Sequence, residues 1–418
     1  MFLLYEVLAI IFILFSPIIF FIRLITGKED VNRILEKYCI YSKNYKNVKT
    51  IWFHGASVGE ILSIIPIIKI LEKNKKIKRI LLTSTTKSSA LIYNKYKFKK
   101  TIHAYYPIDE NNLTKRFINY WKPHLAIFID SEIWPNMFIN LNKKKIPILL
   151  VNGRITSKSF YRWMKFIKFA KQIFSKITLA LPQNKETAIY LKKLGVKNIK
   201  ISGNLKYFGE IENNTDQKLI KFFKNKNIFC CVSTHNNEEK FIGQIHKEIK
   251  KVYKSLITII IPRHINRVDE IYNQLSNLKL RVVKYKNFIE GKNDCDILLV
   301  DTYGEAIKFY NISKCVFVGK SLVESLKNTS GQNPIEPSRL GCKIFHGPNV
   351  SNFKDVYEYL ASLNVAKKVE NPKELSEMLV SELKTAETNN YEIIEKIENY
   401  GANTLNNVLR EIKIYINN

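Results

Sequence analysis

The segment at residues 54–60, His-Gly-Ala-Ser-Val-Gly-Glu, constrains the fold more than any other part of this sequence. An apolar run at 51–53 precedes it, and a run with helical periodicity at 61–71 follows it. This order is typical of a buried strand, a tight turn and a helix that begins under a carboxylate. In an open α/β sheet such a turn lies at the carboxyl end of a strand, where ligands bind. Glu60 is therefore either a general base or an acid that stabilises a helix N-terminus.

Short β-branched runs alternate with helical stretches along most of the chain, which predicts parallel, doubly wound sheets. The strands expected before residue 209 are Thr50–Phe53, Arg79–Thr83, Thr101–Tyr105, Leu125–Ile129, Ile146–Val151, Thr178–Leu181 and Ile199–Ser202. The strands expected after residue 217 are Ile228–Val232, Leu256–Ile261, Leu280–Val283, Ile297–Val300, Cys315–Val318 and Lys343–Phe345. A tail at 372–415 is expected to be helical. We expect an α/β protein of two Rossmann-like domains with a cleft between them.

The chain of 418 residues is too long for one ordinary core, so we divide it into four parts. Residues 1–27 are a hydrophobic anchor, and 28–208 form the first domain. The polar stretch 209–217 is a linker. Residues 218–418 form the second domain together with the C-terminal helices.

The N-terminus carries no charge between Glu6 and Arg23. Its length is near the lower limit for a membrane-spanning helix, about 17–25 residues. No small-residue cleavage site follows, so we expect an uncleaved anchor. Basic residues just after it favour a cytoplasmic position for the next domain. A spanning helix and a helix that lies in the membrane interface both remain open.

Composition limits the partners and the compartment. The formal net charge of +30 attracts polyanions, which include nucleic acid, anionic membranes and phosphorylated substrates. Six cysteines without a C-x-x-C pair argue against a zinc ribbon or a disulfide framework, and they indicate a reducing compartment. Cys230 and Cys231 are expected to pack on opposite faces of one strand.

Candidate site residues of the first domain follow predicted strands. Asp130 and Glu132 come directly after the strand at 125–129, where one acid suits a helix cap and the other a site. Lys206 follows the last predicted strand of this domain and is placed to face charge.

The second domain carries three turns that suit a nucleotide. Arg263 ends a strong strand, and its guanidinium suits phosphate recognition. His264 beside it is either structural or catalytic. The turn at 301–305 opens a helix whose amides suit a phosphate or a ribose. The turn at 331–337 carries a carboxylate, that of Glu336, for ribose hydroxyls.

Two short patterns imitate known motifs. Gly319-Lys320-Ser321 resembles the end of a phosphate-binding loop, but Lys314 replaces the upstream glycine. Asp294-Cys295-Asp296 resembles a metal-binding pair without a supporting cluster. We interpret both as ordinary loop sequence.

Eight segments in order resemble the Kdo transferases, which add 3-deoxy-D-manno-octulosonic acid (Kdo) to lipid A precursors. They run from just after the apolar N-terminus almost to residue 355. The segments are Ser57-Val58-Gly59-Glu60, Glu132-Ile133-Trp134-Pro135-Asn136, Asn152-Gly153-Arg154-Ile155, Gly203-Asn204-Leu205-Lys206, Ser233-Thr234-His235, Pro262-Arg263-His264, Asp301-Thr302-Tyr303-Gly304-Glu305, and Asn333-Pro334-Ile335-Glu336 with Asn352-Phe353.

The resemblance implies an inverting glycosyltransferase of the GT-B fold, with Glu60 as general base and with Asp130 and Lys206 as charge stabilisers. It implies that the donor is CMP-Kdo, that the acceptor is a lipid A precursor in lipopolysaccharide biosynthesis, and that no metal or other cofactor is needed. It places the enzyme on the cytoplasmic face of the inner membrane, among anionic lipids and without nucleic acid. The residues implied for CMP are Pro262, Arg263, Tyr303, Gly304, Glu305, Asn333, Pro334, Ile335 and Glu336.

The sequence departs from the family pattern at four places. Family members usually carry glutamate where Asp130 stands, aspartate where Phe208 stands, and glycine where Lys320 stands. The glycine-rich turn of the family is here 328–333, Asn-Thr-Ser-Gly-Gln-Asn.

Two other functions compete with this one. One is a GT-B transferase that uses a UDP-sugar for another envelope glycan. The other is a basic, membrane-anchored RNA-binding or scaffold protein, which the acids at the predicted sheet edges disfavour.

Overall fold

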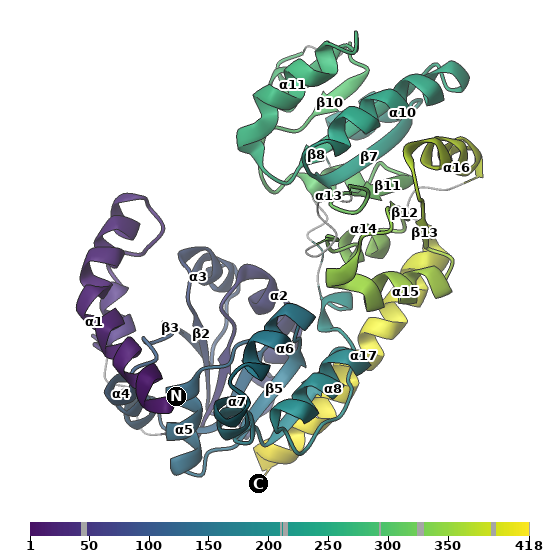
Figure 1. Ribbon diagram of the computed structural model, residues 1–418. Helices are drawn as coiled ribbons and strands as arrows, with labels where there is room; N and C mark the ends of the chain where they lie inside the picture. Colours follow the sequence, from purple (N-terminus) through teal and green to yellow (C-terminus); the bar gives the residue numbers. More distant parts are fainter. Residues whose placement is uncertain are drawn as a thin grey trace. The chain divides into compact units, whose positions relative to one another are not determined.

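The computed structural model describes residues 1–42, 48–209, 211, 216–291, 294–323, 330–385 and 390–417. The chain forms two compact units (Figure 1). Unit 1 comprises Met1–Gly209 and Gly401–Asn418, and unit 2 comprises Glu210–Tyr400. Each unit has its own sheet, and the helix Tyr391–Asn417 contributes residues to both units.

The sheet of unit 1 is parallel throughout, with the strand order β3-β2-β1-β4-β5-β6 among the described residues. Its strands are β1 (Thr50–His54), β2 (Arg79–Ser84), β3 (Thr101–Tyr105), β4 (Pro123–Ile129), β5 (Ile148–Gly153) and β6 (Leu179–Pro182). Successive strands run outward from β1 to β3, and the chain then returns to β4 on the other side of β1. The point where the strand order reverses therefore lies between β1 and β4, which is where open α/β sheets bind ligands.

Apolar side chains alternate between the two faces of this sheet. On β1, Trp52 packs into one core cluster, and Ile51 and Phe53 pack into the other. All three are buried, as expected for a strand covered on both faces. The helices of the unit are α1 (Phe2–Ile25), α2 (Val58–Glu72), α3 (Lys87–Asn94), α4 (Asn111–Trp121), α5 (Pro135–Lys143), α6 (Ser157–Met164), α7 (Ile167–Phe174), α8 (Lys185–Leu194) and the C-terminal part of α17 (Tyr391–Asn417).

Helix α1 packs along the flank of unit 1 instead of projecting from it (Figure 1). The Tyr5 hydroxyl donates to Asp109 at 2.7 Å, and the Arg23 guanidinium binds Glu29 at 2.6 Å. Between these two contacts, the hydroxyls of Ser16 and Tyr38 lie 2.6 Å apart. Tyr5 and Arg23 are about 27 Å apart along a helix axis, at a rise of about 1.5 Å per residue. The contacts therefore hold nearly the whole length of the helix.

The sheet of unit 2 is also parallel, with the order β13-β12-β11-β7-β8-β10-β9 in the described part of the chain. Its strands are β7 (Asn227–Thr234), β8 (Leu256–Pro262), β9 (Val282–Lys284), β10 (Ile297–Leu299), β11 (Cys315–Val318), β12 (Lys343–His346) and β13 (Ala366–Lys368). Here the order reverses between β7 and β11.

Helices pack against this second sheet and form a hydrophobic core with its strands. Residues of α10, α11 and α16 pack with the strands in one cluster, which includes Ile245, Ile271 and Leu379. The helices of the unit are α9 (Gln217–Phe223), α10 (Glu238–Val252), α11 (Val268–Ser276), α12 (Tyr285–Ile289), α13 (Ala306–Tyr310), α14 (Ile335–Arg339), α15 (Lys354–Ser362), α16 (Pro372–Thr385) and the first part of α17. Cys230 and Cys231 are both fully buried in β7, and all six cysteines are buried and free.

The structure differs from the sequence-based expectations in a few elements. Residues 199–202, predicted as a strand, form an isolated bridge between Ile199 and Ala180 and two backbone hydrogen bonds to β6, but no continuous strand. Strand β13 was not predicted, because its sequence Ala-Lys-Lys lacks the apolar character of a central strand. Residues 401–418, assigned from sequence to the second domain, group with unit 1. Of the predicted linker 209–217, residues 210 and 212–215 lie outside the described residues.

The end of α17 contributes to the core of unit 1, so its apolar face should stabilise that unit. Ile412 is fully buried there, whereas Ile414 on the same helix is 48% exposed. We expect Ile412→Ala to lower the free energy of unfolding of unit 1 by roughly 2–5 kcal/mol, as deletion of buried methyl groups does. Ile414→Ala, the matched control, should change it by less than about 0.5 kcal/mol.

Tryptophan fluorescence during urea unfolding would measure this difference. All four tryptophans, Trp52, Trp121, Trp134 and Trp163, belong to unit 1, so their emission reports that unit alone. Equal midpoints for the two variants would show that α17 contributes nothing to this core.

Candidate functional site

Glu60 lies in the first turn of α2, directly after β1. Ser57 caps the helix, and its hydroxyl accepts from the Glu60 amide. The Glu60 carboxylate in turn accepts from the Ala56 amide and the Ser57 hydroxyl, each at 2.7 Å. This is a variant of the capping box. A carboxylate has about four lone-pair sites, so two hydrogen bonds leave Glu60 able to accept a further proton.

The surroundings of Glu60 favour its protonated form. Burial raises the pKa of this carboxyl above its usual range, against the opposing effect of the Ser57 hydrogen bond. The negative charges of Glu132 and Asp130 raise the pKa further. Both acids follow β4, the neighbour of β1, so the reversal of strand order brings the three carboxyl groups together.

Asp130 is held by a sharp turn at the end of β4. Its φ is +60°, a left-handed conformation that aspartate tolerates better than most residues. The Asp130 carboxylate binds the Lys206 ammonium at 3.1 Å and accepts from the Gln183 side-chain amide at 3.2 Å. The same Gln183 amide donates to the Asn152 carbonyl at 3.0 Å. The ends of β4, β5 and β6 and the Lys206 segment thus meet at one edge of the sheet.

Glu132 belongs to a second group of contacts beside Glu60. Its carboxylate lies 3.2 Å from Nε2 of His54 and accepts from the Trp134 indole at 2.9 Å. His54 is fully buried, and its Nδ1 lies 3.0 Å from the Thr83 hydroxyl. The Tyr106 ring stacks on the His54 ring with their centroids 3.9 Å apart. These contacts fix the direction in which the Glu132 carboxylate points.

Unit 2 gathers basic side chains at the carboxyl ends of β7, β8 and β11. His235 follows β7, Arg263 and His264 follow β8, and Lys320 follows β11. Burial lowers the pKa of His235, and the charges of Lys320, His264 and Arg263 lower it further, so the four groups lie close together. The rings of His235 and His264 are 5.8 Å apart. Arg263 and His264 are exposed, and the cluster suits an anionic ligand.

The buried carboxylate of Glu238 holds the backbone of this cluster in place through hydrogen bonds. Glu238 is 1% exposed and accepts from the backbone amides of His235, Lys320, Ser321 and Leu322 at 2.7–3.2 Å. A side chain at Gly319 would come within 2.7 Å of the Thr234 backbone, so glycine is required there. The segment 319–321, interpreted from sequence as an ordinary loop, is therefore a tightly held turn that follows β11 and packs against the end of β7.

The remaining residues implied for CMP lie on two loops at the same sheet edge. Tyr303, Gly304 and Glu305 follow β10, and Tyr303 is 66% exposed. The second loop, 333–336, enters α14, which contacts α13. Burial among surrounding protein atoms raises the pKa of Glu336, although part of its side chain reaches solvent. Of the glycine-rich turn, residues 328 and 329 lie outside the described residues.

The sequence pattern Asp294-Cys295-Asp296 has an ionic role in the structure. Arg281 pairs with both aspartates, and Lys250 pairs with Asp296. These partners hold the pKa of Asp296 well below its usual range, although burial opposes them. Among the residues that the structure describes, no group of three or more His, Cys, Asp or Glu is placed to hold a metal ion.

Several residues of the two sites were missed from sequence. Gln183 follows β6 directly, so the rule that ligands bind at strand ends could have identified it. His54 and Glu238 gave no such signal, because their roles depend on which strands and loops are neighbours. Phe208, at a position where the family usually carries aspartate, packs against the core of unit 1.

Solved structures show which class of fold this is. A glycosyltransferase from Rickettsia africae matches with a TM-score of 0.58 over 88% of this chain and 98% of its own, at 14% identity. A putative UDP-N-acetylglucosamine 2-epimerase from Listeria monocytogenes matches with a TM-score of 0.61 over 88% and 96%, at 13% identity. Identities this low establish the fold alone, which is the two-unit GT-B type with paired Rossmann-like sheets.

Sequence relatives then identify the family. The model of the 3-deoxy-D-manno-octulosonic-acid transferase (kdotransferase) family matches residues 32–208. The 3-deoxy-D-manno-octulosonic acid transferase of Rickettsia bellii is 33% identical over 98% of this chain and 96% of its own length. That of Haemophilus influenzae is 26% identical over 93% and 91%. The chain belongs to the Kdo transferase family and is a glycosyltransferase.

The acids around Glu60 predict a shift in the pH dependence of transfer. Removing the negative charge of Glu132 stabilises the ionised form of Glu60 and lowers its pKa. For Glu132→Gln we therefore expect the acidic limb of kcat/KM to move to lower pH. Glu186→Gln, which alters an exposed acid of α8, should leave the profile unchanged. An unchanged limb in Glu132→Gln would show that Glu60 is not the group that titrates.

Proposed function

We propose that this enzyme transfers Kdo from CMP-Kdo to a lipid A precursor, with Glu60 as the general base. The observation that carries the proposal is the position of Glu60, at the reversal of strand order and with its pKa raised. A raised pKa suits a general base, because proton acceptance is most effective when the pKa lies near the working pH. Membership of the family supports the donor sugar.

The transfer requires an exchange of one bond for another at the anomeric carbon. A hydroxyl oxygen of the acceptor attacks this carbon, and the bond to the CMP phosphate breaks with inversion. The hydroxyl proton goes to the Glu60 carboxylate. The leaving CMP gains negative charge, which the basic cluster of unit 2 around Arg263 would stabilise. We propose no metal for this step, because cationic side chains can supply the charge.

We propose that Asp130 and Lys206 stabilise the charges that develop near the reacting groups. Their ion pair of 3.1 Å is only partly exposed, so solvent screens it incompletely. Lys206 offsets the negative charge of Asp130, and this limits how far the acids raise the pKa of Glu60. Asp130 is one methylene shorter than the glutamate usual in the family, and Lys206 nevertheless reaches it.

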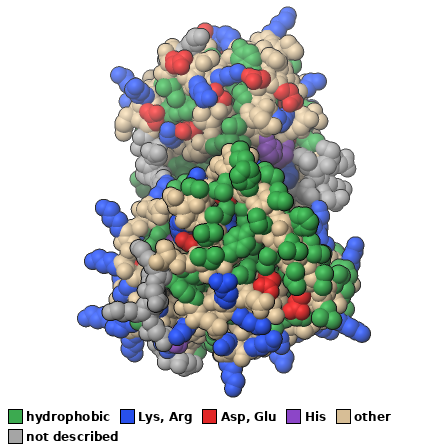
Figure 2. Space-filling view, turned by 90° about the vertical axis from the view of Figure 1, so that its left-hand side faces the viewer, with side chains coloured by type: hydrophobic (Ala, Val, Ile, Leu, Met, Phe, Trp, Pro, Cys, Tyr) green, Lys and Arg blue, Asp and Glu red, His purple; other side chains and the backbone are tan. Residues whose placement is uncertain are grey.

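Helix α1 supports a position on the membrane surface. It is long and apolar enough to cross a membrane by length and composition, and few of its residues are buried. Its contacts with unit 1 along its whole length favour a helix that lies in the interface. Figure 2 shows hydrophobic side chains gathered on this face, with Lys and Arg around them. We propose that this face binds the anionic cytoplasmic leaflet of the inner membrane.

Replacement of the base tests the mechanism. Glu60→Gln keeps an oxygen for the Ala56 amide, so α2 should remain capped. We expect transfer to fall by at least about 10²-fold, the usual contribution of a general base, while CMP binding stays unchanged. Product formation would be followed by mass analysis after incubation with a CMP-Kdo generating system and lipid IVA. Turnover at the wild-type rate would refute the assignment of Glu60.

Competition between nucleotides tests the donor. A UDP-sugar transferase of the same fold would bind UDP and ignore CMP. We expect CMP to protect the wild-type protein against thermal unfolding and UDP to have no effect at equal concentration. Arg263→Ala should remove the protection by CMP. Protection by UDP alone would favour the alternative donor.

A further inference from the structure

A cavity of about 430 Å³ lies between α1 and the body of unit 1. Leu8, Ala9 and Phe12 form the wall on the side of α1, and Tyr106 and Ile108 form part of the opposite wall. The volume falls within the range of about 300–1,000 Å³ that is common for ligand pockets. None of the residues assigned to transfer above lines it.

Of the polar groups of the wall, the Asp109 carboxylate and the Lys37 ammonium already have partners, whereas the buried Tyr106 hydroxyl has none among the described residues. The Asp109 carboxylate accepts from the Tyr5 hydroxyl and from the backbone amides of Asn136 and Met137 at 2.7–3.0 Å. The Lys37 ammonium binds the buried Glu29 carboxylate at 2.7 Å. An occupant would therefore meet mostly hydrocarbon and aromatic surface, which favours an apolar chain over a polar molecule.

On its outer side the cavity is continuous with the exposed apolar face of α1. Leu8 is 55% exposed and Phe12 is 43% exposed, although both also line the cavity. Other exposed side chains of the same helix, including Leu4 and Ile11, extend this surface. A chain that leaves a membrane beside α1 can thus enter the cavity without crossing a polar surface.

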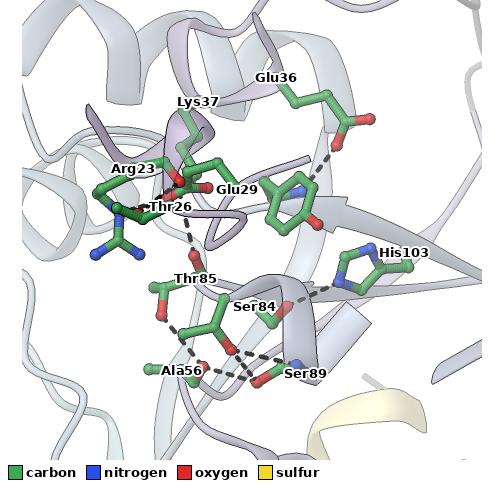
Figure 3. A network of polar contacts seen from close by, with 12 residues as sticks. Arg23, Thr26, Glu29, Glu36, Lys37, Ala56, Ser84, Thr85, Ser89 and His103 are labelled. Carbon is green, nitrogen blue, oxygen red and sulfur yellow. Dashed lines mark hydrogen bonds and ion pairs between the residues drawn. The ribbon is translucent and has the colours of Figure 1, made fainter. Parts of the chain in front are cut away.

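On its inner side the cavity is walled by residues that are hydrogen-bonded to the turn of Glu60 and to Glu132. Thr85 lines the cavity, and its hydroxyl donates to the Ala56 carbonyl at 3.1 Å (Figure 3). The Ala56 amide donates to Glu60 at 2.7 Å. Trp134 also lines the cavity and donates to Glu132 at 2.9 Å. Two wall residues are therefore one or two hydrogen bonds from the acids of the site.

We propose that this cavity holds one acyl chain of the acceptor lipid while its headgroup lies at Glu60. The proposal rests on the proposed function and adds a site for the acceptor's hydrocarbon. The acceptor is favoured over bulk lipid because the cavity opens at the apolar face of α1, while its wall residues Thr85 and Trp134 are hydrogen-bonded to the turn of Glu60 and to Glu132. A molecule with a chain at one end and a reacting hydroxyl at the other matches both features.

Filling the cavity should weaken binding of the acylated acceptor. Ala9 faces the cavity, whereas Val7 lies on the outer face and is 51% exposed. For Ala9→Phe we expect the KM for the lipid A precursor to rise at least about ten-fold, since displacing roughly two chain carbons suffices. Ala9→Leu should give a smaller rise and Val7→Phe none. With the same headgroup stripped of its acyl chains, all four proteins should give equal KM values.

Fluorescence quenching measures occupancy of the cavity without transfer. Bromine atoms on an acyl chain quench a tryptophan that they contact, and Trp134 lines the cavity. In detergent, a precursor with brominated chains should quench the wild-type protein and Val7→Phe equally, and Ala9→Phe less. Trp134→Phe, which removes the reporter, should lose the saturable part of the quenching.

The results separate this proposal from the proposed function. Equal quenching in Ala9→Phe and the wild type, or an equal rise in KM for the stripped headgroup, would overturn the chain site. Equal quenching by brominated phosphatidylglycerol would overturn the acceptor as occupant in favour of bulk lipid. Absence of transfer by the wild type, with the quenching pattern intact, would overturn the proposed function and leave the chain site supported.

Discussion

The candidate site of unit 1 depends on one electrostatic constraint, the closeness of three carboxyl groups that follow two adjacent strands. Glu60 follows β1, and Asp130 and Glu132 follow β4. Carboxylates that lie close together raise one another's pKa unless cations or hydrogen-bond donors stabilise the negative charge. Lys206 offsets Asp130, and the Trp134 indole donates to Glu132. Burial, and after it the charges of Glu132 and Asp130, raise the pKa of Glu60, the residue proposed to accept a proton.

Much of the fold was predictable because parallel strands covered on both faces appear as continuous apolar runs. The strand of Leu125–Ile129 was predicted from this pattern, and it is the core of β4. The exception, residues 199–202, had the pattern but pairs with β6 through one isolated bridge and two backbone hydrogen bonds instead of a continuous strand. The return of 401–418 to unit 1 was not predictable, because periodicity shows that a helix has an apolar face but not which core that face contacts.

For the candidate sites, the sequence predicted which residues lie at the sheet edge but not which of them are neighbours. A residue directly after a strand must lie at the sheet edge, so Glu60, Asp130 and Arg263 were found without knowledge of strand order. Gln183 also follows a strand directly, so the same rule could have found it. The roles of His54 and Glu238 depend on which strands and loops are neighbours, and a single sequence does not encode that order in any local pattern. The eight-segment resemblance added roles that local patterns could not supply, because each segment alone also suits a loop or a cap.

The packing of α1 along unit 1 has a consequence for shortened forms of this protein. Membrane-bound enzymes are often made water-soluble by removing an apolar N-terminus. Here a chain that starts after residue 27 would leave Glu29 without Arg23 and would uncover the apolar wall at Tyr106 and Ile108. Such a truncation would remove one exposed apolar surface and expose another. Aggregation of the shortened protein would therefore result from the loss of helix α1 as a packing partner.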